Sequence, residues 1–286
     1  MTASAGDREH PLVRLWWVFP SVLAIAVTGL ALANRERPLD ASQLPEPLVA
    51  SMRPLAGDAS QSPPWSEVRM VGSRTVNSSY AGSAEVLVET RIERLDASGL
   101  VRRTDDWKQI AGQGALFEER GLIWKGLLGL VRTERTPAPL YHAIFANEGW
   151  LALRTLSVKA TRDPEFPSKE GSALKADIER VREEHPPRAS TLARRRTECR
   201  RNGSFDAGEV FDAWTESLPR VTCDSEEKRG DGPTLYFHTD YVYLASHDLY
   251  IAVAWTDDEP LSPIAGDNGP AARVSGRMRI TRFDVS

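Results

Sequence analysis

The 286-residue sequence contains none of the linear signatures that mark common enzyme classes. A GxSxG nucleophile elbow, a GxxxxGK[ST] phosphate-binding loop and an HExxH zinc motif are all missing. Gly112 and Gly114 lack the third glycine and the following helix of a dinucleotide-binding turn. These absences favour a non-enzymatic protein without a resident cofactor or metal ion, although an active site built from distant residues leaves no linear motif.

The sequence also lacks an excess of charge of either sign. Lys and Arg total 36 against 40 Asp and Glu, which gives a net charge of −4. Proteins that bind nucleic acid through its phosphates need a strongly positive surface, so we expect no nucleic acid among the partners. Apolar residues make up 41% and charged residues 27%, as in a folded globular protein.

Only one long apolar run is present, at 15–33, and it contains no charged residue. As a helix it would span about 28 Å, close to the hydrocarbon core of a bilayer. Trp16 and Trp17 lie at its first edge, where indole rings favour the membrane interface. We predict a transmembrane signal anchor; the alternative is a cleaved signal peptide, because Ala31-Leu32-Ala33 matches a cleavage pattern.

The position of this run predicts the division of the chain. Residues 1–14 form a short N-terminal tail before the predicted transmembrane helix at 15–33. Six prolines at 34–64 predict a stiff linker, with an arm packed on the domain as the alternative. Residues 65–286 then form the main domain. We expect a single-pass membrane protein whose C-terminal domain is extracytoplasmic, in the periplasm or at the cell surface.

The only two cysteines, Cys199 and Cys223, agree with this location. Both have strand-like flanking sequences, and disulfides persist outside the cytosol. We therefore predict a bridge between them, worth about 3 kcal/mol in the chain-entropy account. The alternative is two unrelated thiols. No CxxC motif is present, so thioredoxin-type redox chemistry has no support.

The pattern of the main domain predicts an α+β fold with a mainly antiparallel sheet and one or two helices. Residues 85–95 and 100–107 alternate in polarity around a turn, which indicates a hairpin. A helix is expected at 172–185, because Leu174, Ile178 and Val181 recur at helical spacing. The sequence also predicts a second helix at 207–218 and further strands in the C-terminal third, at 234–245, 249–255 and 275–285.

The most suggestive group of histidine and carboxylate side chains lies in the predicted hairpin at 234–255. His238 and Asp240 share one side of an extended strand, and His247 lies near the following turn. Such a group could act as an acid–base pair or bind a metal ion. The simpler interpretation is a surface histidine beside a solvating carboxylate. We therefore assign no catalytic residue and no metal ligand, and keep these three residues as candidates.

Two other sets of residues raise binding hypotheses. One is a charge cluster that we interpret as a patch for an anionic partner or, alternatively, as a solvated strand edge; it comprises Arg194, Arg195, Arg196, Arg200 and Arg201. The other is a set of tryptophans that either pack in the core or line a glycan-binding groove: Trp65, Trp107, Trp124, Trp150, Trp214 and Trp255.

The function that fits these features best is a membrane-anchored envelope protein with a non-enzymatic binding, scaffolding or assembly role. Its partners would be the membrane, through 15–33, and a protein of the envelope. One alternative is an extracytoplasmic hydrolase or metal-dependent enzyme that uses His238 and Asp240. The other is a secreted protein that binds a glycan or a small ligand.

Overall fold

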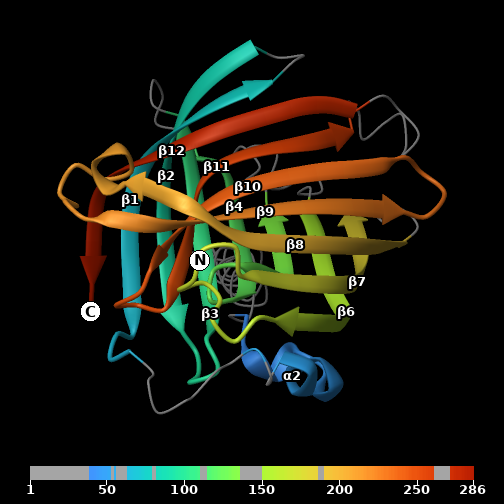
Figure 1. Cartoon of the computed structure of the whole chain (residues 1–286). Coiled ribbons are helices and arrows are strands. Elements are labelled where there is room, and N and C mark those ends of the chain that lie inside the picture. The colour runs from blue at the N-terminus through green and yellow to red at the C-terminus, as the bar shows by residue number, and fades with distance from the viewer. Residues whose placement is uncertain are drawn as a thin grey trace, which may run out of the picture. The chain divides into compact units, whose positions relative to one another are not determined.

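The computed structural model describes residues 39–52, 55, 63–78, 82–109, 115–135, 150–185, 190–260 and 271–286. Their sheet is a closed antiparallel barrel of twelve strands (Figure 1), so the predicted α+β fold is wrong. The strands are β1 Glu67–Ser78, β2 Gly82–Arg94, β3 Leu100–Gln109, β4 Ala115–Trp124, β5 Leu128–Arg135, β6 Trp150–Arg162, β7 Ala173–His185, β8 Thr191–Asp206, β9 Ser217–Arg229, β10 Thr234–Leu244, β11 Leu249–Pro260 and β12 Ala271–Val285.

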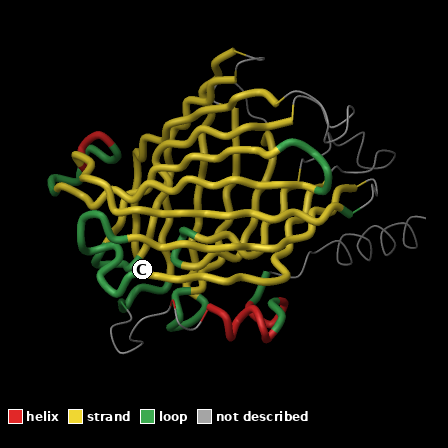
Figure 2. The backbone as a smooth tube through the Cα atoms, turned by 45° about the vertical axis from the view of Figure 1, so that its right-hand side comes forward, coloured by secondary structure: helices red, strands yellow, loops and turns green. Residues whose placement is uncertain are grey.

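The barrel is a simple meander in which each strand pairs with its neighbours in the sequence. Strand β12 then pairs with β1 and closes the sheet, with Val68 opposite Val285. In Figure 2 the strands of the near wall cross over those of the far wall. Closure leaves none of the twelve described strands as a free edge open to pairing with another chain.

Both helices predicted in the main domain are wrong. Residues 173–185 form strand β7, in which Leu174, Ala176 and Ile178 are buried and alternate with exposed Lys175 and Asp177. Apolar residues four positions apart fit a period of two as well as a helix, so the spacing was ambiguous. At 207–218 the structure has only a short 3-10 turn, Ala207–Glu209, whose N-cap is Asp206.

The α-helix in the described residues, α2 (Glu46–Met52), lies within the proline-rich stretch. Its Leu48 and Met52 are buried in the same apolar cluster as Trp124 of β4. Arg162 of β6 donates to the carbonyl of Leu55 at 2.8 Å and ties the end of this segment to the barrel wall. This part of the proline-rich stretch therefore packs on the domain, which was the alternative to a stiff linker.

The predicted disulfide is confirmed. Cys199 of β8 and Cys223 of β9 are bonded, and they stand directly opposite each other in the strand register. Both are buried in the apolar cluster that also holds Leu174 and Val221. The bridge therefore fixes the alignment of two neighbouring strands from within the core.

Across the described ranges, no helix has the length and apolar character needed to cross a membrane. The segment predicted as an anchor, 15–33, lies outside them.

Candidate functional site on the outer face of the barrel

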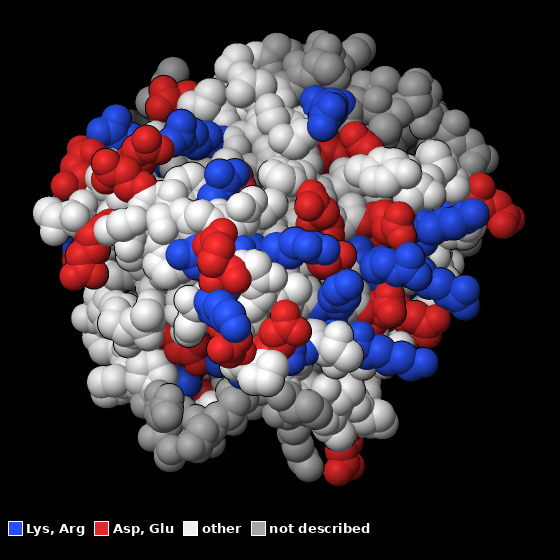
Figure 3. All heavy atoms as spheres, viewed as in Figure 1, with Lys and Arg blue, Asp and Glu red and all other residues white. Residues whose placement is uncertain are grey.

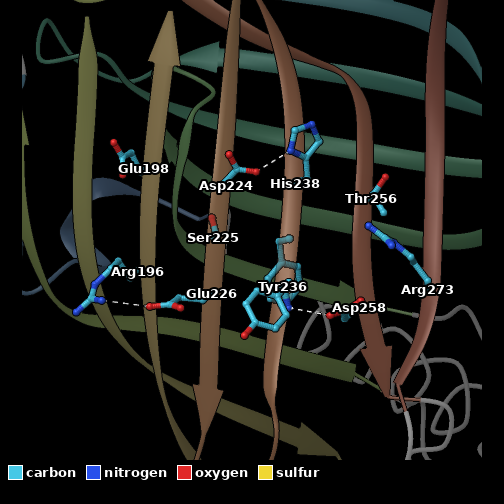
Figure 4. Close-up of a pocket in the computed structure, with 11 residues that line it drawn as sticks. Arg196, Glu198, Asp224, Ser225, Glu226, Tyr236, His238, Thr256, Asp258 and Arg273 are labelled. Atoms are coloured by element: carbon cyan, nitrogen blue, oxygen red, sulfur yellow. Dashed lines mark hydrogen bonds and ion pairs between the residues drawn. The ribbon is translucent and has the colours of Figure 1, made fainter. Parts of the chain in front are cut away.

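The outer face of β8–β12 carries an open hollow of about 730 Å³ (Figure 4). Side chains alternate between the two faces of a strand, so each of these strands presents every second residue to this surface. Neighbouring strands are in register, which places the outward residues in rows across the sheet. The hollow is lined by Arg196, Glu198, Asp224, Ser225, Glu226, Tyr236, Phe237, His238, Thr256, Asp258 and Arg273.

The structure brings His238 and Asp240 together on this face. His238 Nδ1 lies 2.7 Å from Asp224 Oδ1, and its Nε2 lies 3.8 Å from Asp240 Oδ1. Asp224 stands opposite His238 in the register of β9 and β10, so the short contact follows from strand pairing. The imidazole thus lies between two carboxylates.

Asp240 is committed to other contacts. Both of its carboxylate oxygens accept hydrogen bonds from Arg220, at 3.0 and 2.6 Å, and one also accepts from the Thr222 hydroxyl at 2.8 Å. The carboxylate side chain is nearly buried. These bonds make Asp240 a link between β9 and β10 rather than an available acid or base.

His247 is not part of this group. It lies in the turn between β10 and β11, where its Nδ1 is 2.8 Å from the Ser246 hydroxyl. Its ring meets Phe283 edge-on at 5.9 Å between centroids. Partial burial lowers the pKa of His247 below its ordinary value, because the charged form loses solvation. The two histidines of the hairpin therefore have different surroundings and do not form one site.

The recorded polar partners of His238 are both carboxylates. The nearest serine in the lining, Ser225, is buried and shares a 2.9 Å hydrogen bond with Thr197. Among the described residues, no group of three or more His, Cys, Asp or Glu side chains is arranged to hold a metal ion. The site therefore offers an oriented imidazole without an adjacent serine or cysteine nucleophile.

The arginines of the predicted anionic-partner patch do not share one face. Arg194 lies 3.1 Å from Glu179, and Arg196 bridges Asp177 and Glu226 at 3.3 and 3.2 Å. Figure 3 shows the resulting mixture of positive and negative side chains.

The remaining members of this patch have different surroundings. Arg200 pairs with Glu198 on the outside, and the half-buried Arg201 lies 3.1 Å from Glu170. Arg195 faces the barrel interior, where its guanidinium lies 4.5 Å from the Phe237 ring centroid. Strand alternation separates residues that are adjacent in the sequence.

The tryptophans are mainly in the core. Trp65, Trp107 and Trp124 are buried, and Trp214 and Trp255 are half-buried. The side chain of Trp150 lies outside the described residues. The exposed aromatic ring in the hollow is instead Tyr236, which the sequence analysis did not single out.

Sequence reasoning also missed Asp224, the closest partner of His238. A signal for its row was present, because a bridge between Cys199 and Cys223 places the next residues, Glu198 and Asp224, opposite each other on the outer face. The pairing of β9 with β10, which adds His238 to that row, had no comparable marker.

No family model, curated protein or solved structure matches this chain.

Proposed function

We propose that this protein is a membrane-anchored envelope protein whose barrel is a non-enzymatic binding domain outside the cytoplasm. The hollow on β8–β12 is the contact surface in this proposal, and its partner is another envelope protein. The disulfide supports an oxidising compartment, and the apolar run at 15–33 supports attachment to a membrane.

The observation that carries this proposal is the exposure of Tyr236. Its surface is 60% exposed, although it is a large aromatic residue on strand β10. Tyrosine is enriched at protein interfaces, because it offers a wide apolar ring and a polar end. Four carboxylates and two arginines line the same hollow, so the partner should present a positively charged surface.

Site-specific photo-crosslinking in native membranes tests this surface. A photoreactive phenylalanine analogue placed at 236 should give one discrete adduct, which Asp258→Lys should weaken by reversing charge in the hollow. The matched control is position 192 on β8, where Leu192 is also exposed but lies outside the hollow. Equal adducts at both positions, or none at 236, would contradict the proposal.

A second candidate function is the extracytoplasmic hydrolase, which the 2.7 Å contact between His238 and Asp224 favours. In a catalytic triad the imidazole is the general base and the carboxylate holds it in position. His238 and Asp224 would take these two roles, and water would be the nucleophile. His238→Ala and Asp224→Ala test this function, because Asp240 is already held by Arg220 and Thr222. If both variants fold and keep full biological activity, the hydrolase proposal fails.

A further inference from the structure

A second, smaller pocket of about 210 Å³ lies next to the outer hollow. Its lining is apolar except for Asp240 and Arg277, and it includes Val253 of β11 and Met278 of β12. The recorded pairing of β11 with β12 ends on this side with Ala254 opposite Arg277. The small pocket therefore opens where two neighbouring strands part.

The segment between β8 and β9 gives the small pocket a fixed shape. Val210, which follows the 3-10 turn Ala207–Glu209, is part of the lining. Its carbonyl accepts a 2.8 Å hydrogen bond from the backbone N–H of Ile280, and Glu209 lies 2.9 Å from Arg277. These contacts fasten the segment to β12, so a partner does not have to order it on binding.

The strand register places the small pocket directly beside the hollow. Asp240 stands opposite Ala254, and His238 stands opposite Thr256. His238 and Asp240 are two residues apart on one face of β10, and Tyr236 lies two residues further along the same face (Figure 4). The small pocket and the hollow thus form one continuous surface, which extends about 13 Å along the strand from Asp240 to Tyr236.

At the end of this surface that holds the small pocket, the charged groups already have partners. Both carboxylate oxygens of Asp240 accept hydrogen bonds from Arg220, and Arg277 pairs with Glu209. A further polar group would find no free partner here, so the apolar lining favours an apolar group. Pockets for drug-sized ligands are roughly 300–1,000 Å³, so this smaller one suits a single side chain.

At the other end of the surface, the exposed groups favour a cation. The Asp224 side chain is 73% exposed, and its recorded partner is the His238 imidazole. Tyr236 presents a ring that is exposed in the same hollow. A lysine or arginine side chain can pair with an exposed carboxylate and is also attracted by the face of an aromatic ring.

We propose that the small pocket and the hollow together receive one extended segment of the envelope partner, with an apolar side chain in the small pocket and a lysine or arginine over Asp224 and Tyr236. This inference rests on the proposed function and names the chemistry of the partner. Residues four apart in an extended segment lie on the same side at a separation of about 13 Å, which matches the distance along β10. An apolar anchor in a pocket with polar contacts around it is the usual form of an interface hot spot.

Isothermal titration calorimetry of the full chain in non-ionic detergent tests this surface with synthetic peptides. The probe is Leu-Thr-Ser-Thr-Lys, blocked at both ends, together with its reverse, because the segment can run in either direction along β10. Titration into detergent alone is the blank. One of the two peptides should bind wild type saturably, and replacing its leucine with alanine should weaken binding at least about tenfold, as expected for a buried apolar side chain.

Two variants test where each end of the peptide lies. Ala254→Phe fills the small pocket and should abolish the preference for leucine over alanine, whereas the matched control Leu192→Phe lies outside both sites and should keep it. Asp224→Asn should weaken binding of the lysine peptide about threefold, the effect of one exposed ion pair, without changing that of a glutamine peptide. Thermal unfolding shows that each variant is folded, and the comparison of leucine with alanine on wild type needs no variant.

Three results would overturn the inference: no saturable binding of either peptide, equal binding of the leucine and alanine peptides, or an unchanged preference for leucine in folded Ala254→Phe. Photo-crosslinking at 236 in native membranes judges the proposed function separately. A discrete adduct at 236 without peptide binding refutes this inference alone, whereas absence of that adduct refutes the proposed function.

Discussion

The carboxylate of Glu227 offers the sharpest test of the barrel interior. It is fully buried and lies between Arg180 and Arg229, whose side chains are only 10% and 9% exposed. Glu227→Gln keeps the shape of the side chain but removes the one negative charge between two cations. Breaking a buried ion pair from one side costs about 3–5 kcal/mol, because the remaining charge has no compensation. We expect a loss of unfolding free energy of that size.

The assay is equilibrium unfolding of the full chain in detergent with a chemical denaturant, followed by tryptophan fluorescence. Glu226→Gln is the matched control, because the adjacent residue faces outward and pairs with Arg196 at an exposed position. Exposed pairs contribute less than about 1 kcal/mol, so the two variants should differ clearly.

Adding Arg180→Gln to Glu227→Gln should restore part of the lost stability, because it removes one of the two uncompensated charges. Equal unfolding midpoints for Glu226→Gln and Glu227→Gln would refute the account of a charged, buried interior.

Three further predictions concern the disulfide, a histidine and a glycine. Cys223→Ser should lower the unfolding free energy by about 3 kcal/mol, and a reducing agent should shift wild type in the same way but leave the variant unchanged. The folded-state pKa of His247 is lowered, so the unfolded chain binds its proton first as the pH falls; stability should decline below about pH 6.5, and less steeply in His247→Gln. Gly276→Ala should displace the Trp255 ring and cost about 1–3 kcal/mol in a denaturant titration, whereas Gly129→Ala has open space and should be neutral.

The strands were easier to predict than the way they associate. The expected segments at 234–245 and 249–255 overlap β10 and β11, because β-branched and aromatic residues are concentrated there. Leu174 and Ile178 fit both a helix and a strand, and burial of the small Ala176 between them decides for the strand. Closure depends on the pairing of β1 with β12, and no local pattern encodes a contact between such distant segments.

The candidate site was also predictable only in part. Strand alternation was enough to place His238 and Asp240 on one face, and it also explains why Arg195 is separated from Arg194 and Arg196. Asp224 could not be assigned, because its contact with His238 requires the register between β9 and β10. The contact between Arg180 and Glu227 was hidden for the same reason, since it joins β7 to β9 across β8.

The meander has a consequence for how the chain reaches its native state. Of the twelve pairings among the described strands, only the one between β1 and β12 joins segments that are not consecutive. Hairpins can therefore form one after another during synthesis, as local contacts form fastest.

Until β12 emerges from the ribosome, however, β1 and β11 each keep an unpaired edge. The nascent domain is thus most exposed to aggregation just before its last strand is made. Loss of β12 would make that vulnerable state permanent.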